Sequence, residues 1–125
     1  MKPQKNLGIW MDHSIANVID LKSKTHNQSI ESHFDFEIKK EALAKSESLM
    51  HNKKQQMDDA YFKEISDVIL NYENVILFGP TNAKTELHNY LELDSHFKDI
   101  DIKVVPSDKM SKNEKVAFVL NYFYN

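Results

Sequence analysis

The residues best suited to chemistry lie in two short segments of the chain. Asp12-His13 stands between two apolar runs, and a carboxylate beside an imidazole is a pairing that general acid–base catalysis uses. Lys84 follows Gly79-Pro80-Thr81, where a strand gives way to a helix whose free amides, with the lysine, could hold an anion. We therefore take Asp12, His13 and Lys84 as a possible anion or ligand site. An ordinary structural turn is the alternative for each segment.

Other catalytic or metal-binding motifs fail on their spacing. A phosphate-binding P-loop needs a second glycine before its lysine, but Ala83 stands there and the loop is one residue short. The six histidines include no pair at i, i+4 spacing and no H-x-H, and the chain has no cysteine, so we expect no metal and no cofactor. A two-metal nuclease needs a carboxylate on the strand Val75–Phe78, which has none, so we expect no enzymatic activity.

The residues from 39 to 57 form a polar, lysine-rich arm with too few apolar side chains to define a helical face. The arm holds five lysines and two glutamates and so carries +3, and because the whole chain carries −3 the remainder carries −6. Lysines supply charge and glutamines supply adaptable hydrogen bonds, which suits contact with phosphates. A solvated loop is the alternative. The candidate RNA- or ribosome-binding residues are Lys39, Lys40, Lys45, Lys53, Lys54, Gln55 and Gln56.

The composition restricts the classes of protein and the kind of RNA contact. The 125 residues fit one domain, which we expect to span 1–125. No apolar run approaches the length of a membrane span and no signal peptide is evident, so we expect a cytoplasmic protein without a membrane partner. All 16 basic residues are lysine, so any nucleic-acid contact lacks the bidentate grip of arginine and reads sequence weakly.

The apolar pattern predicts the elements that must position these residues. Apolar runs predict strands at Leu7–Met11 and Ile15–Leu21, while alternation predicts strands at Ile30–Ile38 and Ile100–Val104. The run Val75–Phe78 is typical of a strand buried on both faces. Helical spacing predicts three helices: one beginning at Asp58-Asp59, one capped by Thr81, and one with the capping box Ser111–Glu114 and the apolar stripe Val116, Val119, Leu120 and Phe123.

The predicted order is β-β-β-α-β-α-β-α. This is the layout of the ribonuclease H-like fold, an α/β class with a mixed five-stranded sheet and helices packed on it. Pro106 is expected to end the fifth strand.

Several segments together resemble a family of small bacterial proteins often called translational machinery proteins. These proteins are similar to the middle domain of archaeal and eukaryotic peptide-chain release factors and of Pelota, which has the ribonuclease H-like fold. The segments that carry the resemblance are Leu7–Ala16, Leu77–Pro80, Ala83-Lys84, Glu86-Leu87, Lys115–Val119 and Tyr122-Phe123.

The resemblance does not extend to peptide release. Release factors carry Gly-Gly-Gln between the third strand and the first helix, whereas this chain has Lys53-Lys54-Gln55-Gln56 there and no glycine between Gly8 and Gly79. Without glycine the backbone does not readily adopt that loop's conformation. The resemblance thus implies a non-catalytic module of translation or ribosome rescue, with ribosome or RNA as partner. The alternative is a dimeric interaction or stress-related scaffold, paired through a sheet edge and without nucleic-acid binding.

Overall fold

The structure, a computed structural model, describes residues 5–22, 27–31 and 59–124. Apolar runs and alternating segments in these ranges form strands, and segments with helical spacing form helices. The strands are β1 (Asn6–Met11), β2 (Ile15–Ile19), β3 (Asn27–Glu31), β4 (Asn74–Gly79) and β5 (Asp101–Pro106). The helices are one over residues 59–69, α3 (Ala83–Glu92), the short 3-10 helix η1 (Ser95–Phe97) and α4 (Lys112–Tyr124).

The strands form one mixed sheet in the order β3-β2-β1-β4-β5. β1 pairs antiparallel with β2, and β2 with β3, while β1, β4 and β5 run parallel. Two-residue turns suffice for antiparallel neighbours, but parallel neighbours need a crossover, which the helices provide. The observed arrangement confirms the predicted α/β class and the ribonuclease H-like order, with η1 as an addition.

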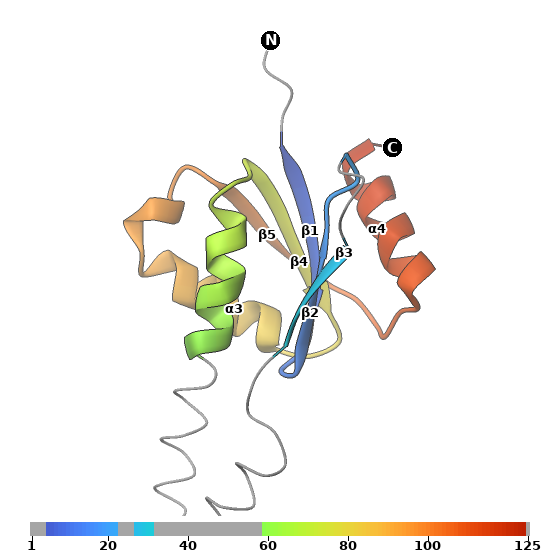
Figure 1. Ribbon diagram of the computed structural model, residues 1–125, viewed down its shortest axis with the longest axis horizontal. Helices are drawn as coiled ribbons and strands as arrows, with labels where there is room; N and C mark the ends of the chain where they lie inside the picture. Colours follow the sequence, from blue (N-terminus) through green and yellow to red (C-terminus); the bar gives the residue numbers. More distant parts are fainter. Residues whose placement is uncertain (1–4, 23–26, 32–58, 125) are drawn as a thin grey trace, which may run out of the picture.

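Helices cover both faces of the sheet (Figure 1). The helix over residues 59–69 and α3 pack on one face, and α4 packs on the other. The inner strand β4, which lies between β1 and β5, contributes to both layers, because Val75 and Leu77 point to the first face while Ile76 and Phe78 point to the second. All four side chains are buried, as expected for a strand with covered faces.

The last helix lies very close to β1. A Cβ placed on Gly8 would lie 2.2 Å from Cγ2 of Val119, so only a glycine lets α4 approach this strand so closely. Phe118 stacks on Phe78 with ring centroids 4.5 Å apart. The predicted capping box is present: Ser111 N–H donates to Glu114 Oε1 and Glu114 N–H to Ser111 Oγ, both at 3.2 Å.

β1 begins at Asn6, β4 spans Asn74–Gly79 and β5 spans Asp101–Pro106, each displaced or extended by one or two residues from its predicted bounds. Four further details of the predicted elements differ from the structure. β2 ends at Ile19 rather than Leu21. β3 begins at Asn27 rather than Ile30, because its ladder extends to the pair Ile19↔Asn27; residues 32–38 lie outside the described residues. The N-cap of α3 is Asn82 rather than Thr81.

The fourth difference concerns the apolar stripe of α4. The predicted stripe includes Leu120, but the Leu120 side chain is 47% exposed. Phe118, which is not part of the predicted stripe, supplies the contact with Phe78. The large aromatic ring sets the rotation of α4 on the sheet, since offset stacking adds to the area that it buries.

Candidate functional site

The predicted polar residues lie at the end of the sheet where β1 and β4 have their carboxyl ends. These strands are parallel neighbours with Trp10 paired to Phe78, so the residues that follow each strand emerge together. The backbones meet closely here: Gly79 has φ +140, and a Cβ on it would lie 2.1 Å from the carbonyl oxygen of Met11. Asp12, His13 and Lys84 therefore lie at the same end of the fold.

Asp12 organises the turn between β1 and β2. Its Oδ1 accepts hydrogen bonds from the backbone N–H of Ser14 at 2.7 Å and of Ile15 at 2.9 Å. Its own N–H donates to the carbonyl of Ile15 at 3.0 Å. The hydroxyl of Tyr61 donates to the carbonyl of Asp12 at 2.9 Å and ties the turn to the helix over residues 59–69. The Asp12 carboxylate thus acts as an acceptor for a tight turn, as aspartate often does.

His13 pairs with Glu86, which the sequence indicated as part of the family resemblance but not as a site residue. Its Nε2 lies 2.8 Å from Oε2 of Glu86 in α3, and the two side chains are 43% and 50% exposed. Glu86 lies in the first turn of its helix, where a carboxylate is common, so nothing in the sequence linked it to His13. Asp12 and His13 therefore serve different partners, and the geometry contains no Asp–His relay.

Lys84 points into the protein rather than into solvent. It is 8% exposed, and its Nζ donates to the carbonyl of Thr81 at 2.5 Å. The N–H of Ala83 donates to Thr81 Oγ1 at 3.2 Å in the same turn. The lysine thus supplies the hydrogen-bond donor for the Thr81 carbonyl in the loop between β4 and α3, since a carbonyl shielded from water needs a donor. An anion bound here would have to compete with Thr81 for this ammonium group.

The lysine-rich arm lies outside the described residues. This holds for every one of its candidate binding residues: Lys39, Lys40, Lys45, Lys53, Lys54, Gln55 and Gln56. Within 5–22, 27–31 and 59–124, no group of three or more histidine, aspartate and glutamate side chains is placed to hold a metal ion. No helix in that part of the chain is both long and apolar enough to cross a bilayer.

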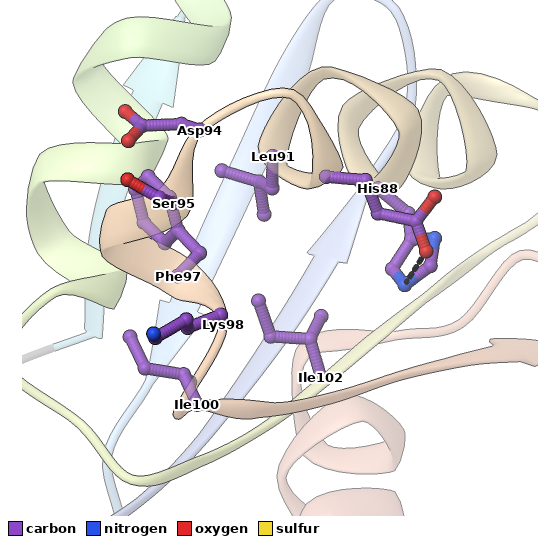
Figure 2. A pocket seen from close by; sticks show the side chains of 9 residues that line it. His88, Leu91, Asp94, Ser95, Phe97, Lys98, Ile100 and Ile102 are labelled. Carbon is purple, nitrogen blue, oxygen red and sulfur yellow. Dashed lines mark ion pairs between the residues drawn. The ribbon is translucent and has the colours of Figure 1, made fainter.

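A cavity of about 450 Å³ lies away from these residues, between α3, η1 and the start of β5 (Figure 2). Leu91, Phe97, Ile100 and Ile102 give it an apolar wall. Its polar members are His88, Glu92, Asp94, Ser95 and Lys98. The periodicity predicted apolar faces for the elements that contain Leu91, Ile100 and Ile102, but it gave no sign of η1 with Phe97 or of a space between these three elements.

Two ion pairs involve the polar rim of this cavity. His88 Nε2 lies 3.6 Å from Glu92 Oε1, drawn as a dashed line in Figure 2. Asp94 Oδ1 lies 2.5 Å from His96 Nδ1 and also accepts the backbone N–H of His96 at 2.9 Å. The backbone donor first, and then the imidazole, lowers the pKa of Asp94 below its ordinary value. The polar rim thus holds two carboxylates, Glu92 and Asp94, each beside an imidazole.

On the opposite face, Lys115 connects α4 to the first hairpin. Its Nζ lies 3.6 Å from the centroid of the Trp10 ring and donates to Asn17 Oδ1 at 2.7 Å. Burial lowers the pKa of Lys115, and the charge of Asp12 opposes that shift. Lys115 therefore helps to pack α4 on the first hairpin, and its ammonium group makes a cation–π contact with the buried Trp10 ring.

Comparison with solved structures finds the same fold in Pelota proteins. The crystal structure of Archaeoglobus fulgidus Pelota matches 98% of this chain with a TM-score of 0.58 and 10% sequence identity. Thermoplasma acidophilum Pelota matches 94% of this chain with a TM-score of 0.58 and 16% identity. This chain spans about a third of each Pelota chain, 32% in both cases. No protein-family model and no curated protein matches the sequence. What this chain shares with Pelota is therefore the fold of the part that it covers.

Proposed function

We propose that this protein is a non-catalytic module of translation or ribosome rescue that associates with the ribosome or with RNA in the cytoplasm. The observation that carries the proposal is the likeness to two Pelota proteins over at least 94% of this chain. The segments named in the sequence lie in the same order as in release-factor middle domains and support the same reading. A domain of this fold can dock on a partner through its surface residues, because function depends on the site that a fold carries.

The proposed contact surface is the arm from Lys39 to Met57. Its charge of +3 stands against −6 on the rest of the chain, so phosphates are attracted to the arm rather than to the remainder. Lysine and glutamine contact phosphate oxygens without reading bases, so the proposed binding is weakly dependent on RNA sequence. Two observations support a role without hydrolysis. No Gly-Gly-Gln occurs in the sequence, and Asp12 and His13 have separate structural partners.

Sedimentation with ribosomes tests this proposal. The wild-type protein is expected in the ribosome pellet at low salt and in the supernatant at moderately high salt, because lysine–phosphate contacts release counterions. The variant Lys53→Glu/Lys54→Glu should bind less at low salt. Lys63→Glu/Lys109→Glu is the charge-matched control, since it makes the same change in net charge on two exposed lysines outside the arm.

Each result of this experiment decides between specific claims. Absence from the pellet at both salt concentrations would contradict ribosome association. Equal loss of binding in the two double variants would show that net charge alone governs binding and would contradict the arm as the contact. Retained binding in Lys53→Glu/Lys54→Glu would also contradict the arm as the contact surface.

A second candidate function is a homodimeric interaction scaffold without nucleic-acid binding. The observation that favours it is the position of β5, which has β4 on one side and no further strand on the other among the described residues. An unpaired edge presents backbone donors and acceptors to another chain. Purified protein that forms a stable dimer in sizing experiments and retains no RNA would support this candidate over the first.

A further inference from the structure

We infer that β5 pairs antiparallel with β5 of a second copy of this chain, about a two-fold axis that passes through Ile102. The inference rests on the second candidate function and names its interface, register and charged residues. In this arrangement two five-stranded sheets join into one continuous sheet. The pairing is isologous, as in most two-fold symmetric dimers.

The hydrogen bonds to β4 determine which backbone groups of β5 are available. The N–H of Asp101 donates to the carbonyl of Glu73 at 2.9 Å, so the backbone of Asp101 faces β4. Backbone groups of alternate residues face opposite edges of a strand. The N–H and C=O groups of Ile102 and Val104 therefore face the edge of β5 that has no neighbouring strand within residues 5–22, 27–31 and 59–124, while those of Lys103 face β4.

Only one of four two-fold registers suits these side chains. Centring the pair on Asp101 sets two aspartates opposite each other, and centring it on Lys103 sets two lysines opposite each other; like charges in these positions destabilise strand pairs. Centring it on Val104 places Pro106 opposite Ile102, where proline lacks the N–H that the ladder needs. Centring it on Ile102 avoids all three conflicts.

The register centred on Ile102 also joins opposite charges. It places Asp101 of each copy opposite Lys103 of the other, so the two-fold axis generates this pair twice. Both side chains are available, since they are 56% and 58% exposed. They lie on the same side of β5, because Lys103 Nζ is 3.9 Å from Asp101 Oδ1 within one chain. Two charges that attract each other weakly within a strand would each gain a directly opposed partner.

The other side of β5 supplies an apolar contact. Ile102 and Val104 pack against the core on the face covered by α3, and Ile102 also lines the cavity beside η1. The chosen register sets Ile102 of one copy directly opposite Ile102 of the other, beside that cavity. A second copy would remove this apolar surface from water.

Charge exchange tests the register. Analytical ultracentrifugation of the full chain is expected to show a concentration-dependent dimer. Asp101→Lys and Lys103→Asp should each raise the dimer dissociation constant about tenfold, because each creates two like-charged pairs. Asp101→Lys/Lys103→Asp should restore dimerisation to near the wild-type value. Circular dichroism spectra of all four proteins should superimpose, since both positions are exposed.

The outcomes separate this inference from the scaffold function beneath it. A wild-type protein that stays monomeric at high concentration contradicts both. A dimer that is unaffected by the single variants, or not restored in the double variant, leaves a dimeric scaffold but overturns the β5 interface.

A cross-link provides an independent measurement, because the chain has no cysteine. In an antiparallel hydrogen-bonded pair the facing Cα atoms lie about 5.5 Å apart, within the range of roughly 4.4–6.8 Å that a disulfide spans. Ile102→Cys should therefore form a covalent dimer on mild oxidation. Lys63→Cys, on the helix over residues 59–69, is the control and should remain monomeric. Equal cross-linking of the two variants, or none with Ile102→Cys, would overturn the inference.

Discussion

Nε2 of His13 lies 2.8 Å from Oε2 of Glu86, and this contact joins the turn after β1 to the first turn of α3. The two residues are 73 positions apart in the sequence. The contact places the imidazole against a carboxylate of another element rather than against its neighbour Asp12. It therefore connects the β1–β2 turn to α3 at the carboxyl ends of the parallel strands.

The first prediction concerns the strength of this pair. Because both side chains are about half exposed, a double-mutant cycle of His13→Ala and Glu86→Ala should give a coupling free energy of about 0.2–1 kcal/mol. The coupling should fall as salt is added, since exposed charges are screened. Urea unfolding of the four proteins measures it. A coupling that does not change with salt would contradict an ionic contribution.

The second prediction concerns Asp12. Asp12→Ala removes the acceptor for the N–H groups of Ser14 and Ile15, so the free energy of unfolding should fall by about 1–3 kcal/mol. Asp12→Asn keeps an amide oxygen at the same position and should lose less than half as much. Urea unfolding checks both variants. Equal losses would show that the negative charge, rather than the acceptor geometry, stabilises the turn.

The third prediction uses the two glycines as a contrast. Gly79→Ala places a Cβ 2.1 Å from a backbone oxygen of Met11, at φ +140. It should destabilise the protein by at least about 3 kcal/mol, since a strained backbone alone contributes roughly 1–3 kcal/mol. Gly8→Ala instead meets the side chain of Val119, which a second substitution can shorten.

Gly8→Ala should therefore be compensated by Val119→Ala. Each single variant should lower the free energy of unfolding by about 1–3 kcal/mol, through overpacking and through a cavity respectively. The double variant should lose less than the sum of the two by at least about 0.5 kcal/mol, because the added and removed methyl groups occupy the same space. Additive losses measured by urea unfolding would contradict the close approach of α4 to β1.

The fourth prediction concerns alkaline pH. Burial first, then the hydrogen bond to Asp20 at 2.8 Å and the charge of Asp20, raises the pKa of Tyr72 from its ordinary value of 10.0 to about 12. The folded state therefore holds this proton more tightly than the unfolded state. The stabilisation is fully present below pH 10 and is lost as the pH rises towards 12.

Tyr72→Phe isolates this effect from the lysines that titrate in the same range. The difference in free energy of unfolding between the wild type and Tyr72→Phe should shrink from pH 9 to 12 as the wild type loses its advantage. Urea unfolding at several pH values measures it. A difference that stays constant over this interval would contradict the raised pKa.

Much of the fold followed from local patterns. The run Val75–Phe78 predicted a strand covered on both faces, and Ser111–Glu114 predicted the reciprocal cap that the structure contains. The rotation of α4 was predicted less well, because hydrophobicity alone did not distinguish Leu120 from Phe118. The contact with Phe78 decides between them, and Phe78 lies in another element.

The candidate site divides in the same way. The sequence identified Asp12 as a turn residue and grouped it with His13 and Lys84. The parallel pairing of β1 and β4 places all three residues at the carboxyl ends of these strands. The sequence did not indicate that Glu86 would bind His13 or that Lys84 would turn inward to Thr81. Both contacts depend on where α3 starts relative to β1.

The sequence by itself determined the order and type of the strands and of the three longer helices, since apolar spacing and capping depend on residues within a few positions of one another. It also determined the partition of charge and the absence of arginine, which restrict any nucleic-acid contact to lysine. Only the tertiary structure decided that β4 lies between β1 and β5, that β5 lies at the edge of the described sheet, and that a cavity remains between α3, η1 and β5. The physical reason is that these features arise from contacts between segments far apart in the chain, which pack according to their shapes as well as their hydrophobicity.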